Sequence, residues 1–256
     1  MINLLKYDFK RNANLILAGA AILVLAQAAL MLAGWWRDWD GQILYIGIMV
    51  IYVLFGFLAY LMMCQTYNGN IRSYSRRLLP LGSWYLPVSP FLLLVICYLA
   101  LGAMFVLFDT LFSLIFDVKD TLFSMLRQFV GQIGFWDSAA MTFNFLWGLL
   151  FITVAVFMAI TVARTIDGKG GTFMGIAAFI ALFALIVWIE ALLFPQTKDD
   201  SSWGIVSIEI NEGAIVSGAI SKANTSFDWG LLLFELAIVA ALYYAILYML
   251  DRKVKL

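Results

Sequence analysis

Three acidic residues stand inside long apolar runs: Asp109, Glu190 and Glu235. A charged side chain at the centre of a bilayer costs about 3 kcal/mol on insertion scales, so such acids usually face a cavity or the interior of a helix bundle. Each lies in the half of its run that we orient outward below. Two interpretations stay open: the carboxylates extend toward the outer headgroups, or they line a water-filled vestibule.

Other groups that could do chemistry are scarce. The sequence has no histidine, which removes the commonest general base and the commonest metal ligand. Its two cysteines, Cys64 and Cys97, lie in or beside apolar runs and form neither a disulfide framework nor a metal cluster. We therefore expect no catalytic residue and no metal site in this chain.

The segment Asp167–Thr172 combines three glycines with a lysine and a threonine, as phosphate-binding loops do. A P-loop, however, requires glycine, four residues, then Gly-Lys-Ser/Thr on a turn from strand to helix. This segment is instead a short turn between two apolar runs. We expect no ATP site and no cofactor bound by this chain.

Composition places the chain in the membrane class. Apolar residues make up 64% of the 256 residues and charged residues only 12%, whereas soluble domains carry about 25% charged residues. One globular core cannot enclose so much apolar surface, so the excess must meet lipid. The formal net charge of zero also excludes a nucleic-acid binder driven by positive charge.

Six apolar runs have the roughly 20 residues that a helix needs to cross a bilayer. They are continuous, which favours helices over the alternating strands of a barrel. The first run resembles a signal peptide up to Ala28, but it continues to Trp36 and is predicted to be a membrane span. The six predicted spans are Asn14–Trp36, Ile43–Met63, Phe91–Phe116, Ala139–Ala163, Phe173–Phe194 and Trp229–Leu250.

Orientation follows from lysine and arginine, which concentrate in cytoplasmic loops. With both termini inside, the inner segments hold 11 of the 16 basic residues, and the outer segments hold ten of the 16 acids. Most tryptophans fall near the outer boundary, where their amphipathic rings prefer the headgroup level. We therefore predict a helical protein of six spans with both termini in the cytoplasm.

Four connecting segments are long enough to form structure. Residues 1–12 are predicted to form an amphipathic helix on the inner surface, with Ile2, Leu5 and Phe9 on one face. The outer segment Asp117–Ser138 has helical periodicity and is predicted to form an interfacial helix. The outer loop Pro195–Asp228 is predicted to contain a β-hairpin, because the β-branched run Ile205–Ile210 is followed by a glycine-bearing turn and the apolar stretch 214–216.

The fourth connecting segment is the inner loop Cys64–Pro90. It is longer than an antiparallel helix pair requires, and its second half is apolar and punctuated by proline and glycine. We predict one short helix near Asn70–Leu79, whose exposed apolar and arginine side chains form a docking surface. Its candidate docking residues are Arg72, Tyr74, Arg76, Arg77, Leu78 and Leu79.

At the inner end of the fifth span, Gly171 and Gly175 form a G-x-x-x-G pattern that Ala178 continues. Small residues at this spacing let two membrane helices approach closely. The pattern predicts a tight contact between this span and a neighbour.

At the inner loop the chain resembles the permease subunits of ABC-2 type ATP-binding-cassette transporters, including those of lantibiotic-immunity and drug-efflux systems of Gram-positive bacteria. Three features carry the resemblance across the chain. They are a basic amphipathic start at Leu5–Arg11, a basic stretch leading into a Leu-Leu-Pro element at Arg76–Leu81, and a charged tail at Leu250–Val254. The loop Pro195–Asp228 is longer than in minimal members of that family.

The resemblance implies an exporter of a peptide, lipid or drug-like substrate in the bacterial cytoplasmic membrane. Two copies of a separate cytoplasmic ATPase would supply ATP and Mg²⁺ chemistry, and a coupling helix, matched here by Gly69–Gly82, would dock on that ATPase. A second permease subunit, identical or related, would complete the translocation path.

Two other classes remain open. An autonomous channel or secondary carrier would show inverted repeats or broken helices at mid-membrane, and neither is evident in the sequence. A membrane-embedded enzyme or assembly factor is the third class, and the absence of histidine and of paired inner-face carboxylates weighs against its enzymatic form.

Overall fold

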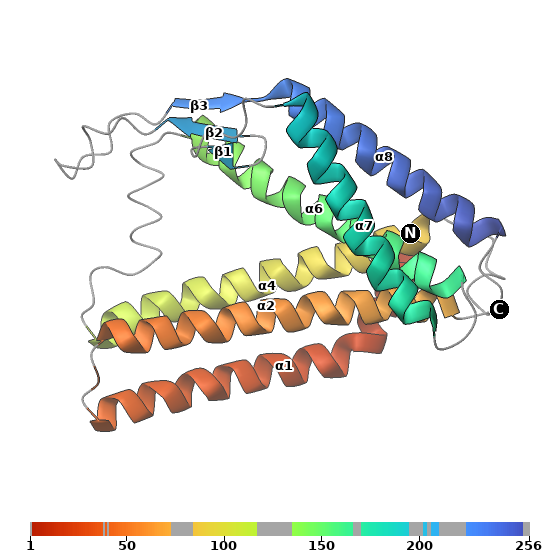
Figure 1. Cartoon of the computed structure of the whole chain (residues 1–256). Coiled ribbons are helices and arrows are strands. Elements are labelled where there is room, and N and C mark those ends of the chain that lie inside the picture. Colours follow the sequence, from red (N-terminus) through yellow and green to blue (C-terminus); the bar gives the residue numbers. More distant parts are fainter. Residues whose placement is uncertain are drawn as a thin grey trace. The chain divides into compact units, whose positions relative to one another are not determined.

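Among the residues that it describes, the computed structural model has six long helices and three short strands (Figure 1). It describes residues 2–37, 39, 41–72, 84–116, 135–165, 170–194, 202–203, 206–209 and 224–252. The helices are α1 (Ile2–Arg37), α2 (Gly41–Arg72), α4 (Tyr85–Phe116), α6 (Phe135–Thr165), α7 (Gly170–Leu193) and α8 (Trp229–Arg252).

All six helices are long and apolar enough to cross a membrane. Large apolar side chains cover their outward surfaces: Leu17 is 68% exposed, Val53 73% and Phe173 74%. Such surfaces are stable only when lipid or another apolar partner covers them. The prediction of six membrane-spanning helices is thus confirmed by their number, length and composition.

The helices extend beyond the predicted spans. The expected helix of residues 1–12 is not a separate element, because α1 runs without interruption from Ile2. The expected end of the second helix near Cys64 is wrong, since α2 continues to Arg72. The third helix begins at Tyr85 rather than after Pro90; Pro87 lies in its first turn, where a missing N–H costs nothing.

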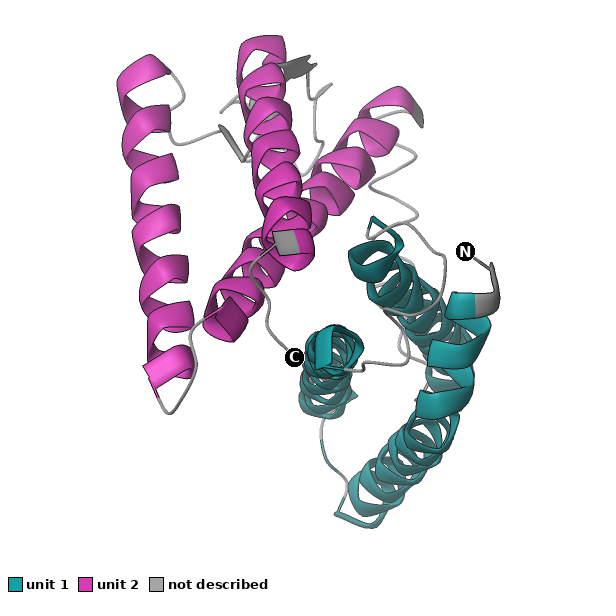
Figure 2. Cartoon of the chain, turned by 90° about the vertical axis from the view of Figure 1, so that its right-hand side faces the viewer, with its two compact units in different colours: residues 1–124 teal, residues 125–256 magenta. Residues whose placement is uncertain are grey.

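The chain divides into two compact units, residues 1–124 and 125–256, shown in teal and magenta in Figure 2. In unit 1, each of α1, α2 and α4 packs against the other two. One of its apolar clusters is Leu44, Ile48 and Phe112 near the end of α1, and another is Met62, Leu93 and Cys97 near the middle of α4.

In unit 2, α6 packs against both α7 and α8. Gly175 lies directly against α6, and a Cβ built on it would stand 2.7 Å from the Ala163 Cβ and 2.9 Å from the Ala159 carbonyl oxygen. The close approach expected at the G-x-x-x-G pattern is therefore present. Asp228 caps α8, because its Oδ1 accepts hydrogen bonds from the backbone N–H groups of Gly230 and Leu231 at 3.0 and 3.1 Å.

Three short strands form an antiparallel sheet in the order β1 (Ser202–Trp203), β2 (Val206–Glu209), β3 (Asn224–Phe227). β2 lies within the predicted strand Ile205–Ile210. It pairs with β1 on one side and with β3 on the other, Val206 lying opposite Phe227. The predicted second strand at 214–216 lies outside the described residues, so the strand that pairs with β2 along its full length is one that the sequence pattern did not predict.

Other predictions also fall where no structure is described. Most of the interfacial helix expected over Asp117–Ser138, residues 117–134, lies outside the described residues. Its last four residues, Phe135–Ser138, form the first turn of α6. Of the short helix expected at Asn70–Leu79, the first three residues are the end of α2 and the rest lie outside the described residues.

Candidate functional site

A buried polar network joins the three helices of unit 1 at the end where α1 begins. Its centre is Asp8, which is fully buried. The Oδ2 atom of Asp8 accepts a 2.6 Å hydrogen bond from the Ser89 hydroxyl of α4 and a 3.1 Å hydrogen bond from the Asn70 amide of α2. Asn70 is 0% exposed and Ser89 1% exposed. One carboxylate thus ties together residues separated by up to 81 positions in the chain.

The network continues one turn along α1. The Asn12 amide donates to the hydroxyl of Thr66 on α2 at 3.1 Å and to the backbone carbonyl of Asp8 at 2.9 Å. Arg11 donates to the backbone carbonyl of Thr66 at 3.3 Å. The guanidinium of Arg11 also lies beside Gly69, with Nη1 3.5 Å from where a Cβ would stand.

Helical spacing explains why these side chains meet. Asp8 and Asn12 are four residues apart on α1, and Thr66 and Asn70 are four apart on α2, so each pair lies on one helix face. Leu4, one turn before Asp8, is also buried. The two polar faces pack together, and Ser89 completes the network from the first turns of α4.

The chemistry of this network is structural. A buried polar group without a partner costs about 1–3 kcal/mol, whereas here donors and acceptors from three helices satisfy one another. Such a network holds the beginning of α1, the end of α2 and the beginning of α4 as one body. The two helices that flank residues 73–83 are therefore linked to each other through Asp8.

That segment carries most of the predicted docking residues. One of the six predicted docking residues, Arg72, lies outside that segment. It is the last residue of α2 and is exposed, two positions beyond the buried Asn70. The remaining docking residues lie outside the described residues: Tyr74, Arg76, Arg77, Leu78 and Leu79.

The three acids of the apolar runs have different surroundings. Asp109 of α4 is 2% exposed, and its Oδ1 accepts a 2.6 Å hydrogen bond from the Tyr45 hydroxyl of α2. In unit 2, Glu235 of α8 accepts a hydrogen bond from the indole N–H of Trp147 on α6. Glu190 of α7 is half-buried.

The sequence interpretation did not single out Asp8, Asn12, Thr66, Asn70 or Ser89. Thr66 and Asn70 lie in the predicted inner loop Cys64–Pro90, whereas in the structure they belong to α2. The useful signal was the spacing, because Asp8 and Asn12 on one helix and Thr66 and Asn70 on another each lie four residues apart. Polar residues at such positions pair with one another as readily as they mark a helix end.

Metal and thiol chemistry has no support within the described ranges. Among these residues, no three histidine, cysteine, aspartate or glutamate side chains gather at one point. Cys97 is buried, Cys64 is partly buried, and both thiols are free.

The fold defines the class of this chain as a multi-pass helical membrane protein, on the length and apolar surface of its six helices. Comparison with protein-family models, with curated proteins and with solved structures found no match.

Proposed function

We propose that this chain is the permease subunit of an ATP-driven ABC transporter of the ABC-2 type. In this proposal both termini and the segment between α2 and α4 face the cytoplasm of a bacterial cell, and the β1–β2–β3 sheet lies outside. Two copies of a cytoplasmic ATPase hydrolyse ATP, a second permease subunit completes the path, and the substrate is a peptide, lipid or drug-like molecule.

The observation that carries the proposal is the position of the Asp8 network. A transporter driven by a separate ATPase needs a cytoplasmic element whose displacement moves several membrane helices together. Hydrogen bonds from Asn70 and Ser89 to Asp8 hold both flanks of residues 73–84 to the beginning of α1. A force applied to that segment would move α1, α2 and α4 as one body.

Two further features support the proposal. The sequence resemblance to ABC-2 permeases centres on the same segment, at Arg76–Leu81. Glu190 and Glu235 are partly exposed acids of unit 2, and we propose that they line the translocation path. Asp109 is bonded to Tyr45 and buried, which suits it better to holding α2 and α4 together.

The test is the double variant Arg76→Glu/Leu79→Asp, co-expressed with the cytoplasmic ATPase that the proposal requires. We expect the variant to insert normally, to lose co-purification of the ATPase and to lose transport-linked ATP hydrolysis. The control is Lys6→Glu, which makes the same charge reversal as Arg76→Glu at an exposed position at the beginning of α1. Wild-type coupling in the segment variant would reject the proposal, and transport by this chain without nucleotide would identify a secondary carrier.

A further inference from the structure

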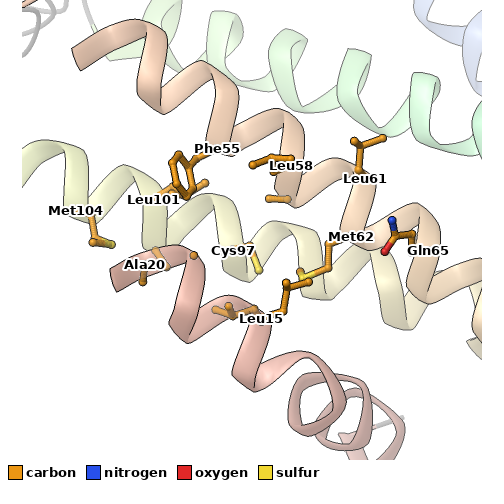
Figure 3. Close-up of a pocket in the computed structure, with 14 residues that line it drawn as sticks. Leu15, Ala20, Phe55, Leu58, Leu61, Met62, Gln65, Cys97, Leu101 and Met104 are labelled. Atoms are coloured by element: carbon orange, nitrogen blue, oxygen red, sulfur yellow. The ribbon is translucent and has the colours of Figure 1, made fainter. Parts of the chain in front are cut away.

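An apolar groove of about 350 Å³ runs between α1, α2 and α4, entirely within unit 1 (Figure 3). Leu15 and Ala20 of α1 form one wall, Phe55 and Leu58 of α2 the other, and Cys97 of α4 lies between them. Its volume lies in the range of ligand sites, about 300–1,000 Å³. Among the lining side chains only Gln65 carries an amide, and Figure 3 shows it at one end of the groove with Met104 at the other.

The length of the groove fits one leaflet of a bilayer. Its α2 wall extends from Phe55 to Gln65, which at 1.5 Å per residue is about 15 Å. The hydrocarbon core of a bilayer is about 30 Å thick, so each leaflet contributes about half of that length. The groove therefore matches a single acyl chain that lies along the helices, with Gln65 at the headgroup end.

Two arginines follow the groove at that end. Arg11 lies four residues before Leu15 on α1, and Arg72 lies seven residues after Gln65 on α2, so each continues the groove face of its helix. Both side chains are exposed. Arg11 contacts the Thr66 carbonyl at 3.3 Å, which places its guanidinium next to the turn that carries Gln65. The apolar groove thus opens toward a positively charged rim.

We propose that this groove is a binding site for one acyl chain of an anionic phospholipid, whose phosphate lies between Arg11 and Arg72. Guanidinium groups bind phosphate oxygens through two parallel hydrogen bonds, and basic pockets between membrane helices select anionic headgroups. The inference rests on the placement of unit 1 in a bilayer and is independent of ATP-driven transport.

The test measures lipid retention on the full chain. Protein reconstituted in nanodiscs of phosphatidylglycerol and phosphatidylcholine at 1:4 is released into the mass spectrometer, and the two retained lipids are counted. A charge-assisted hydrogen bond from a guanidinium to the phosphate changes affinity by about tenfold. We therefore expect Arg11→Gln/Arg72→Gln to lower the ratio of retained phosphatidylglycerol to phosphatidylcholine by at least tenfold.

The control is Lys6→Gln/Lys10→Gln, which removes the same charge from exposed positions at the beginning of α1. We expect it to change the ratio by less than twofold. Equal losses in the two double variants would show that general attraction to basic residues retains the lipid, and would overturn the site.

A second measurement tests the acyl chain. Phosphatidylglycerol with a photoreactive group in its chain should cross-link to Met62 and Cys97, which are only 6% and 8% exposed at the floor of the groove. Ala20→Phe should fill the groove and abolish these cross-links, while Ala28→Phe, at an exposed position of the same helix, should leave them intact. Cross-links confined to exposed side chains such as Leu17 would show annular lipid only and would overturn the proposal.

Discussion

Ser89 of α4 donates a 2.6 Å hydrogen bond to the buried carboxylate of Asp8 on α1. This bond joins the first turns of two helices at the place where the chain leaves α2 and enters α4. Asn70 reaches the same oxygen from α2, so loss of the carboxylate removes the acceptor shared by two buried donors.

Asp8→Ala is therefore expected to lower the free energy of unfolding by about 3 kcal/mol, because the buried amide of Asn70 and the hydroxyl of Ser89 lose their common acceptor. Thermal unfolding in detergent, followed by tryptophan fluorescence, measures the effect. Asp8→Asn keeps an acceptor oxygen and should recover at least half of the loss. The control Lys6→Ala, at an exposed position of the same helix, should change stability by less than about 0.5 kcal/mol. An unchanged Asp8→Ala variant would show that water or other groups replace the carboxylate at no cost.

Tyr45→Phe removes the hydroxyl that donates to buried Asp109 and is expected to cost about 1–3 kcal/mol. The same unfolding assay measures it. Tyr244→Phe, on a side chain that is 71% exposed, is the matched control and should be nearly neutral. A water-filled vestibule at Asp109 would let solvent replace the tyrosine, and the two variants would then behave alike.

Gly175→Leu is expected to separate α6 from α7, because a side chain there would meet Ala163 and the Ala159 backbone. Overpacking of this kind costs about 1–3 kcal/mol, and no flexible side chain can move aside for it. Gly148→Leu on α6 adds the same side chain where nothing lies within 4 Å of a Cβ. Stability in increasing amounts of a denaturing detergent should fall for the first variant only. Equal behaviour of the two would mean that the helices do not pack through Gly175.

Topology has a separate test in a variant without Cys64 and Cys97. Single cysteines at Ser75 and Ser201 are expected to react with a membrane-impermeant thiol reagent from opposite sides. Ser201 should react in intact cells and Ser75 only after the membrane is opened. Reaction of both from one side would contradict six spans with cytoplasmic termini.

The six spans were predictable because the length of an apolar run and the thickness of a bilayer are enough to identify a span. The ends of the helices were not predictable, because the polarity of the sequence shows where a helix leaves the lipid and not where the helix itself ends. α2 continues past Cys64 through Thr66 and Asn70, whose polar groups bond to α1 instead of to water. No local pattern identifies that partner, which lies more than 50 residues earlier in the chain.

In the small sheet, too, the local sequence pattern does not identify the partner of a segment. The β-branched residues of Val206–Glu209 favour a strand, and a strand forms there. The strand that pairs with all four of its residues, Asn224–Phe227, has a polar sequence without a comparable preference. Pairing between strands depends on which segments the fold brings together, so local propensity predicted one strand of the pair and missed the other.

The continuation of α2 to Arg72 has a mechanical consequence. A helix of 32 residues is about 48 Å long at 1.5 Å per residue, and only about 30 Å of it can lie in hydrocarbon. In the proposed topology the remainder extends beyond the hydrocarbon on the cytoplasmic side, where the Asp8 carboxylate links it to α1 and α4. In the proposed transporter, a displacement at the end of α2 near Arg72 would tilt the whole helix, and shortening α2 by one turn there would reduce that tilt without changing any residue inside the bilayer.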